Sequence, residues 1–430
     1  MYRTKIKNLI TWKLSKKRKP LIFLGARQVG KTWLIQEFGR KEYKQMAYIN
    51  FEHPNAPKNL FEIDFDADRI FTVLNAYCKM KINAADTLIV FDEIQAAYKG
   101  LTALKYLYED APEYHIIAAG SLLGINIHPD ESFPVGKVDF MKLYPMSFYE
   151  FLLAMGETGV AELLEKRDLA NLYFFKAKLI NLLRYYLYVG GMPEAVEEFV
   201  ENRDWQQVRK IQDQILKSYR GDFSKHAPIE ILPRINMVWD SIPAQLSKEN
   251  KKFIYGVIKE GARAKDFELA IQWLTDTGLL HKVYNTSKPA LPLVAYQELS
   301  AFKLFHNDVG LLSAMSRLNA KIIADSDAIF EEFKGALAEQ YVFQQLIQKE
   351  DISLFYHSFD NSKYELDFLI QNQNDEIIPV EVKSGKNLQA VSFKLFCKKN
   401  NPQTAIRTSL TDYKEEEWMT NVPLYAINTI

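Results

Sequence analysis

The sequence predicts an α/β protein whose N-terminal part is a parallel sheet with helices on both faces. Apolar runs alternate there with segments of helical character, and each run is ended by glycine or polar residues. The runs are residues 20–24, 46–52, 87–93 and 115–121. Continuous apolar runs are typical of parallel strands buried on both faces, and the alternation with helices indicates crossover connections. The functional residues of such a sheet are expected where its strands end.

The first apolar run leads into a glycine-rich loop that precedes a helical segment, residues 33–38. Gly25, Gly30, Lys31 and Thr32 match the phosphate-loop pattern Gly-x4-Gly-Lys-Thr. The N–H groups of such a loop surround a phosphate, and the helix N-terminus adds a favourable dipole. We expect Lys31 to reach the β- and γ-phosphates and the Thr32 hydroxyl to ligate Mg²⁺. The other loop residues expected to contact the nucleotide are Ala26, Arg27, Gln28, Val29 and Trp33.

The third and fourth runs end in polar residues that should lie at the same edge of the sheet. We expect Asp92 to hold Mg²⁺ directly or through water, and Glu93 to polarise an attacking water. Ser121 is expected to hydrogen-bond to the γ-phosphate or to that water. Since Asp-Glu also begins helices well, the alternative for Glu93 is the cap of a surface helix.

The bulk composition excludes several classes of protein. The 430 residues suffice for two to four domains, and the 54 basic residues balance the 54 acidic ones, so no global charge favours nucleic acid or membrane. The cysteines, Cys78 and Cys397, are far apart, which favours a reducing, cytoplasmic location. No apolar run is long enough for a membrane helix.

The basic residues 1–19 are expected to form a solvated helix packed on the N-terminal domain; a membrane- or nucleic-acid-binding helix is the alternative.

The residue pattern changes twice in the middle of the chain. Residues 143–218 read as helical and rich in aromatic residues, with a turn at 190–193. Helical segments at 250–260 and 266–276, then extended segments from 278 to 296, predict a winged-helix-like unit. Its second helix carries acids that would oppose a phosphate backbone, namely Asp266, Glu268 and Asp276. We therefore favour a structural or protein-contact role for this unit over DNA reading.

The last hundred residues predict a helix at 335–349, followed by extended segments at 352–359, 364–371 and 377–382. Asp367 and Glu381 lie on neighbouring segments and can hold a divalent ion, with Lys383 orienting water or stabilising charge. Glu339, on the preceding helix, can join them. The alternative is a half-exposed sheet with ordinary surface charges.

Taken together, these motifs resemble the prokaryotic AAA-type ATPases with a C-terminal region known as DUF4143 (AAA_14 plus DUF4143). The segments that carry the resemblance are residues 2–3, 25–32, 91–95, 119–121, 143–148, 190–193, 302–304, 308–312, 365–367 and 380–383. The resemblance implies an AAA-like ATPase core, a winged-helix region and a domain similar to PD-(D/E)xK nucleases. Asp367, Glu381 and Lys383 match that nuclease signature.

One position departs from the family pattern. Where relatives often have Gly-Arg before the Tyr-Pro segment, this chain has Gly136-Lys137, and lysine lacks the planar fork of arginine. No arginine can therefore be assigned to a neighbouring site. The candidates are Arg69, Arg184, Arg203 and Arg220.

The expected organisation is a P-loop ATPase core (1–158), a helical lid (159–228), a winged-helix-like region (229–325) and a nuclease-like α/β domain (326–430). The expected function is Mg²⁺-dependent ATP hydrolysis coupled to the C-terminal domains. Two alternatives are a nucleotide-gated DNA- or protein-binding switch with slow hydrolysis, and an ATP-regulated nuclease. A phosphotransferase is less favoured, because no acceptor-binding lid follows the loop. The expected ligands are ATP, Mg²⁺ and a second divalent metal in the C-terminal domain; the partner would be DNA or a protein, not a membrane, and an oligomer is compatible with the sequence.

Overall fold

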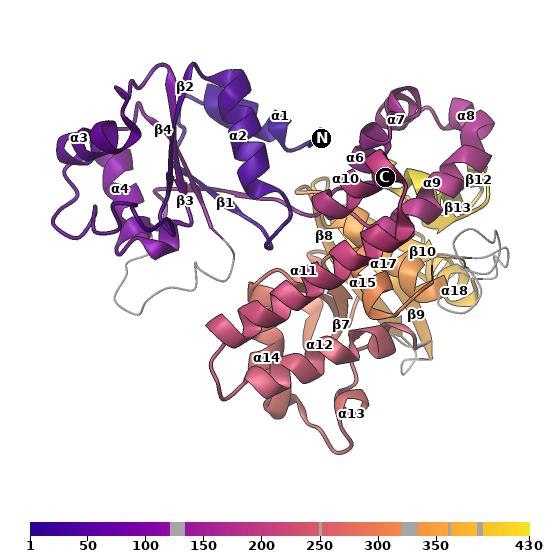
Figure 1. The fold of residues 1–430 in the computed structure, drawn as a ribbon. Helices are drawn as coiled ribbons and strands as arrows, with labels where there is room; N and C mark the ends of the chain where they lie inside the picture. The colour runs from indigo at the N-terminus through magenta and orange to yellow at the C-terminus, as the bar shows by residue number, and fades with distance from the viewer. Residues whose placement is uncertain (121–133, 249–251, 320–333, 360–362, 385–389) are drawn as a thin grey trace. The chain divides into compact units, whose positions relative to one another are not determined.

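The computed structural model describes residues 1–120, 134–248, 252–319, 334–359, 363–384 and 390–430 (Figure 1). The chain divides into two compact units. The N-terminal unit is Arg3–Tyr144 with Asp276–Gly278, and the C-terminal unit is Pro145–Thr275 with Leu279–Ile430 and Met1–Tyr2.

The N-terminal unit is built on a five-stranded parallel sheet in the order β2-β3-β4-β1-β5. Its strands are β1 (Leu21–Leu24), β2 (Gln45–Asn50), β3 (Thr87–Asp92), β4 (His115–Ala119) and β5 (Asp139–Lys142). The first four confirm the apolar runs read from the sequence. The register places Ala119 of β4 beside both Phe23 of β1 and Asp92 of β3, so these three strands end at one level.

Helices cover both faces of this sheet, as predicted: α1 and α2 lie on one side, α3 and α4 on the other (Figure 1). Their bounds are α1 Ile6–Leu14, α2 Lys31–Glu42, α3 Ala67–Cys78 and α4 Gly100–Asp110, with a short 3₁₀ turn, η1, at Ile94–Ala96. One apolar cluster lies between the sheet and α3 and α4, and α2 buries Leu34, Ile35 and Phe38 as well.

The basic N-terminal segment packs on its own unit. Leu9 and Trp12 of α1 are buried, and the Trp12 ring lies 6.5 Å from the Phe38 ring of α2 and 6.1 Å from the His115 ring of β4. The Trp12 indole N–H donates to the carbonyl oxygen of Lys19 at 2.9 Å. The expectation of a packed, solvated helix is confirmed.

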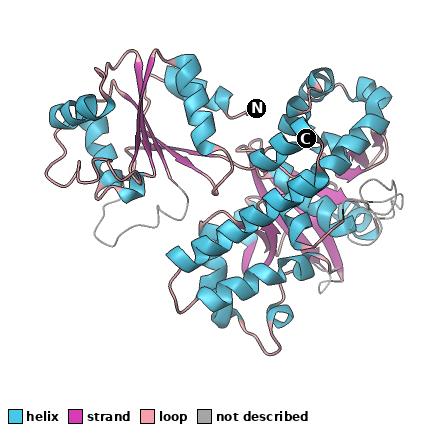
Figure 2. Cartoon of the chain, viewed as in Figure 1, coloured by secondary structure: helices cyan, strands magenta, loops and turns pink. Residues whose placement is uncertain are grey.

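The C-terminal unit combines many helices with an eight-stranded mixed sheet in the order β12-β13-β11-β10-β9-β8-β6-β7 (Figure 2). The strands are β6 (Leu280–Thr286), β7 (Gln297–His306), β8 (Ile352–Phe359), β9 (Tyr364–Asn372), β10 (Ile377–Val382), β11 (Ile406–Ser409), β12 (Lys414–Glu416) and β13 (Met419–Pro423). The helices are α6 (Phe148–Ala154), α7 (Thr158–Glu165), α8 (Leu169–Leu172), α9 (Lys176–Val189), α10 (Pro193–Asn202), α11 (Trp205–His226), α12 (Leu232–Leu246), α13 (Tyr255–Ile258), α14 (Ala264–Asp276), α15 (Val309–Met315), α17 (Lys334–Leu346) and α18 (Val391–Asn400). Three short 3₁₀ turns are η2 (Tyr173–Phe175), η3 (Leu293–Tyr296) and η5 (Leu424–Thr429).

The segment expected to be winged-helix-like differs from the prediction in its details. The helix expected at 250–260 is reduced, among the residues described there, to the single turn α13. The second strand of the hairpin starts at Gln297, after η3, where the sequence suggested that it ended near 296. The hairpin also joins the larger sheet, because β6 pairs in parallel with β8 through Tyr284 and Phe355. One sheet therefore spans position 325; the boundaries at 158, 228 and 325 stay predictions.

A buried carboxylate ties together three segments of the C-terminal unit. Asp308 accepts hydrogen bonds from the N–H of Gly191 at 2.6 Å, the N–H of Leu311 at 2.9 Å and the side-chain amide of Gln344 at 3.1 Å. The Leu311 bond caps α15, and the other two reach the turn at 190–191 and helix α17. Two motifs of unassigned role, residues 190–193 and 308–312, are thus explained by packing.

Backbones approach closely at the same place, and this gives a stability prediction. A Cβ on Gly310 would lie 2.5 Å from both the backbone nitrogen of Gly190 and the carbonyl oxygen of Val189. We expect Gly310→Ala to lower the free energy of unfolding by about 1–3 kcal/mol or more, measured by urea denaturation, because neither backbone atom can move easily.

Gly221 provides the matched control. It lies within α11, and a Cβ added there would meet no atom within 4 Å. Gly221→Ala should raise stability by up to about 1 kcal/mol through helix propensity. Equal effects of the two substitutions would contradict the packing argument.

Candidate nucleotide-binding site

The loop between β1 and α2 has a backbone that depends on its glycines. Gly30 has φ +92° and precedes the first residue of α2, while Gln28 also has a positive φ of +66°. A Cβ on Gly25 would lie 2.5 Å from the carbonyl oxygen of Leu143. The N–H of Leu143 donates to the carbonyl oxygen of Leu24 at 2.8 Å. Only glycine at position 25 lets the loop pack this closely against residue 143.

Arg3 fixes the loop from a distant part of the sequence. Its buried guanidinium donates to the carbonyl oxygen of Val29 at 2.7 Å and to that of Tyr144 at 2.5 Å. The sequence reading placed Arg3 within a shared motif but gave it no role, because no local pattern announces a contact with a residue 26 positions away.

Lys31 folds back over the loop that it follows. Its ammonium donates to the carbonyl oxygens of Gly25 at 2.8 Å and Ala26 at 2.9 Å. Desolvation lowers the pKa of Lys31 to about 8, although the negative charges of Glu93 and Asp92 act in the opposite direction. The Lys31 ammonium, which we expect to bind phosphate, therefore lies against the loop and interacts electrostatically with both carboxylates.

Asp92 ends β3 facing the start of α2. Its Oδ2 accepts hydrogen bonds from the Thr32 hydroxyl, at 3.3 Å, and from the Tyr48 hydroxyl. Burial raises the pKa of the Asp92 carboxyl, against the lowering effect of the hydrogen bond from Tyr48. The two residues expected to share Mg²⁺ therefore contact each other. Tyr48, on the neighbouring strand β2, was not singled out from the sequence, because a tyrosine in a strand is usually a packing residue.

Glu93 leaves the strand in a left-handed conformation, with φ and ψ both 49°. Such a conformation is uncommon for a residue other than glycine and is often found at functional sites. The Glu93 carboxylate accepts a hydrogen bond from the side chain of Gln95, and its side chain makes no capping bond to η1. Among the charges that raise the pKa of Lys31, Glu93 has the largest effect. The helix-cap alternative therefore lacks its expected hydrogen bond.

The other residues predicted from the sequence are distributed as follows. Ser121 lies outside the described residues; β4, which precedes it, ends at Ala119. Trp33 lies in the first turn of α2 and is 43% exposed. Arg27 is half-buried and Gln28 is exposed.

The arginine candidates and Lys137 all have partners elsewhere. Arg69 pairs with Asp64 at 2.7 Å, and Lys137 pairs with Glu109 at 2.8 Å. Arg184 donates to the side chain of Asn181 at 3.0 Å. None of these contacts involves the phosphate loop.

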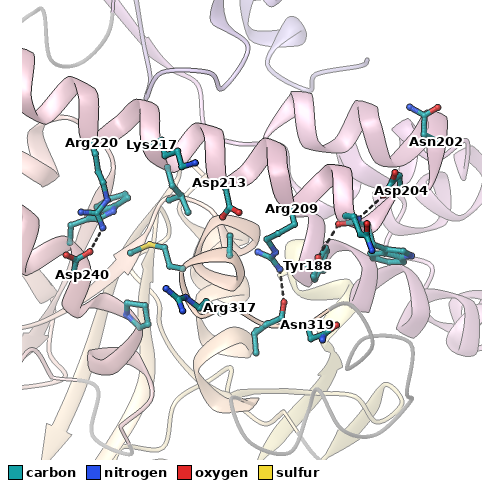
Figure 3. A pocket seen from close by; sticks show the side chains of 18 of the residues that line it. Tyr188, Asn202, Asp204, Arg209, Asp213, Lys217, Arg220, Asp240, Arg317 and Asn319 are labelled. Atoms are coloured by element: carbon teal, nitrogen blue, oxygen red, sulfur yellow. Dashed lines mark hydrogen bonds and ion pairs between the residues drawn. The ribbon is translucent and has the colours of Figure 1, made fainter.

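Arg203 and Arg220 line a cavity of about 1360 Å³ within the C-terminal unit, along one face of α11 (Figure 3). Its basic lining residues are Arg203, Arg209, Lys217, Arg220 and Arg317, and its acidic ones are Asp204, Asp213 and Asp240. Arg220 pairs with Asp240, as Figure 3 shows. Asp204 caps α11 through its side chain. Without the Arg220–Asp240 pair, the side chains that line the cavity still carry a net positive charge.

The acids predicted near the C-terminus lie on adjacent strands. Asp367 of β9 accepts a hydrogen bond from the N–H of Val382 at 2.7 Å. Glu381 of β10 is buried and pairs with Lys383 at 2.7 Å, and burial raises the pKa of the Glu381 carboxyl. Glu339 of α17 is also buried. Across the described part of the chain, no group of three or more His, Cys, Asp or Glu residues is placed to hold a metal ion.

Comparison with protein families agrees with the resemblance. A model described as an AAA domain (AAA_14) matches residues 17–152, and a domain of unknown function, DUF4143, matches residues 334–427. The chain has an AAA domain followed by a DUF4143 domain. Between them, a second domain of unknown function, DUF8612, matches residues 180–322. The AAA match contains the loop, Tyr48, Asp92 and Glu93.

More distant comparisons add little to this AAA plus DUF4143 architecture. No curated protein matches the chain. The Walker-type ATPase PABY2304 of Pyrococcus abyssi is 13% identical, with a TM-score of 0.45 over 73% of this chain and 95% of that one. The Aeropyrum pernix ORC1 protein, solved in complex with DNA, is 12% identical, with a TM-score of 0.28 over 74% and 93%. Separately, none of the described helices is long and apolar enough to cross a membrane.

The lowered pKa of Lys31 predicts how ATP affinity depends on pH. With a pKa of about 8, Lys31 is largely neutral at pH 9, whereas phosphate binding favours its charged form. We expect ATP binding at pH 9 to take up a proton and ATP affinity to fall as pH rises from 7 to 9.5. Isothermal titration calorimetry in buffers of different ionisation enthalpy measures both quantities.

Lys31→Arg is the control, because guanidinium stays charged throughout this range. Its ATP affinity should be lower but nearly independent of pH. A parent protein whose binding heat does not change with the buffer would contradict the prediction.

Proposed function

We propose that the protein binds ATP with Mg²⁺ at the loop following β1 and hydrolyses it, and that nucleotide state controls the winged-helix-like and nuclease-like C-terminal regions. The observation that carries the proposal is the 3.3 Å contact between the Thr32 hydroxyl and the Asp92 carboxylate. This contact supports the proposal, because it joins a hydroxyl of the helix that follows the phosphate loop to a carboxylate at the end of β3, the two oxygen ligands that such a loop and its metal would need.

The residues fit a magnesium nucleotide chemically. Hydroxyl and carboxylate oxygens are the hard ligands that Mg²⁺ prefers, so Thr32 and Asp92 would hold the ion. The ion would neutralise charge on the β- and γ-phosphates. Lys31 would exchange the carbonyl oxygens of Gly25 and Ala26 for phosphate oxygens, which are stronger acceptors for an ammonium. Tyr48 would keep the Asp92 carboxylate in place.

Glu93 is the proposed general base. It would accept a proton from the water that attacks the γ-phosphorus, while the bond to the β–γ bridging oxygen breaks to give ADP and phosphate. Gln95 would hold the Glu93 carboxylate in position through the hydrogen bond that the two side chains already form. Ser121 remains the proposed contact to the γ-phosphate or the water.

Two substitutions separate binding from hydrolysis. Lys31→Ala should abolish ATP binding, because it removes the ammonium that meets the phosphates. Glu93→Gln should retain ATP binding but slow hydrolysis by about 10²–10⁴-fold, the usual worth of a general base. Equilibrium binding and phosphate release under single-turnover conditions measure the two effects.

Glu52→Gln is the matched control, since Glu52 is an exposed glutamate two residues beyond β2 on the same edge of the sheet. It should hydrolyse ATP at the parent rate. If Glu93→Gln also did so, Glu93 would not be the base.

A second candidate function is a nucleotide-gated switch that binds DNA, and the cavity along α11 favours it. Lys217 and Arg317 line this cavity and form no ion pair with any described residue. Arg209 stacks on the Tyr188 ring at 4.2 Å and donates to the carbonyl oxygen of Leu318 at 3.1 Å, which fixes its direction. Arg209 and Lys217 come from α11 and Arg317 follows α15, so cations from two elements line the cavity, which suits a phosphate backbone.

This switch predicts salt-dependent binding of a fluorescent single-stranded DNA in the ATP state. Lys217→Ala with Arg317→Ala should weaken binding at least tenfold and reduce the salt dependence, because two phosphate contacts are lost. Fluorescence anisotropy between 50 and 200 mM salt tests it. Lys265→Ala, on α14 among acids, serves as the control; DNA affinity equal in ATP, ADP and nucleotide-free states would rule the switch out.

A further inference from the structure

The acidic residues at the carboxyl end of the chain surround a lysine that the nuclease resemblance did not include. Lys303 lies on β7 and is completely buried. Its ammonium is 2.7 Å from Glu365 Oε1 and 3.6 Å from Glu339 Oε2. It also lies 4.9 Å from the centre of the Tyr356 ring. Both charged and aromatic partners therefore compensate its burial.

The same lysine is linked to the two predicted metal ligands. Glu365 and Asp367 are two residues apart on β9 and so lie on one face of the sheet. The antiparallel register, which pairs Val380 with Phe368, brings Glu381 opposite Asp367. The four carboxylates thus form one cluster, which consists of Glu339, Glu365, Asp367 and Glu381.

Lys303 remains a cation in this cluster. The Glu365 carboxylate at 2.7 Å and the Glu339 carboxylate at 3.6 Å compensate the desolvation of its ammonium. Lys383 supplies a second positive charge through its ion pair with Glu381.

A divalent metal does not fit this arrangement. Mg²⁺ and Mn²⁺ need several oxygens free to converge on the ion, and a fixed ammonium beside them repels it. Here Glu365 and Glu339 face Lys303, Glu381 faces Lys383, and one Asp367 oxygen accepts from the backbone of Val382. Each of the four acids therefore already has a positively charged or N–H partner. The buried Glu381 Oε2 accepts no hydrogen bond from any described residue, but one free oxygen does not provide the several ligands that these ions need.

We propose that the Lys303 ammonium is the permanent cation of this cluster, in place of the divalent metal that the nuclease resemblance implies. The lysine comes from the β6–β7 hairpin, whereas the carboxylates come from α17, β9 and β10. The cluster therefore clamps the hairpin to the DUF4143 domain, and this domain does not cut DNA through a metal at Asp367 and Glu381. The proposal is independent of the ATPase proposed above.

Manganese binding tests the proposal on the full-length, nucleotide-free protein. An Asp92→Asn background removes the carboxylate at the end of β3 that faces the phosphate loop, so remaining Mn²⁺ binding reports on other sites. We expect electron paramagnetic resonance titrations up to 1 mM Mn²⁺ to be unchanged by adding Asp367→Asn. Mn²⁺ binding that is lost with Asp367→Asn would overturn the proposal, and so would DNA nicking that requires Asp367.

Removing the ammonium should expose the cluster to added metal. Lys303→Met keeps the length of the side chain but leaves Glu339 and Glu365 without their cation, so we expect a lower melting temperature that 1 mM Mn²⁺ partly restores. The parent melting temperature should not respond to Mn²⁺ in the same background. Adding Glu339→Gln and Glu365→Gln to Lys303→Met should restore stability without metal.

Lys288→Met is the matched control, because Lys288 is an exposed lysine on the same hairpin whose ammonium lies 5.5 Å from the Tyr296 ring centre. The Lys288→Met protein should have the same melting temperature as the parent protein. A Lys303→Met protein as stable as this control would overturn the clamp. The Mn²⁺ titrations of the parent and Asp367→Asn proteins test whether the cluster binds metal, even if the Lys303→Met protein does not fold.

Discussion

The site in the N-terminal unit depends on one constraint, which is that three parallel strands end at the same level. Because Phe23, Ala119 and Asp92 are in register, the carboxylate at the end of β3 meets the first turn of α2. The hydrogen bonds from Thr32 and Tyr48 then hold a carboxylate that burial would otherwise make costly. The loop, the lysine and the acids acquire their arrangement from this register.

In the C-terminal unit, too, buried charged groups are held by hydrogen bonds and ion pairs from other segments. Asp308 is buried and accepts three hydrogen bonds from a turn, a helix start and a glutamine. Lys303 is buried and faces two carboxylates from other elements. In both cases a buried charge selects one arrangement of segments that are distant in sequence, since any other arrangement would leave that charge without a partner.

The sequence was most informative where the signal is local. Continuous apolar runs identified four of the five parallel strands, and the glycine spacing identified the loop. Strand β5 was missed because it has only four residues and only one of them is buried, so it lacks the continuous apolar run of the other strands. Arg3, Tyr48 and Lys303 were missed because their roles come from contacts with residues 26, 44 and 62 positions away. No periodicity or spacing encodes such contacts.

The close fit between Gly25 and residue 143 has a mechanical consequence. The carbonyl oxygen of Leu143 fills the space where any larger residue would carry its Cβ, and the Leu143 N–H is bonded to Leu24. Two residues later, at Pro145, the chain passes from one compact unit into the other. Any shift of the loop at Gly25 would therefore press directly on backbone that lies two residues before this crossover, because no side chain separates the two.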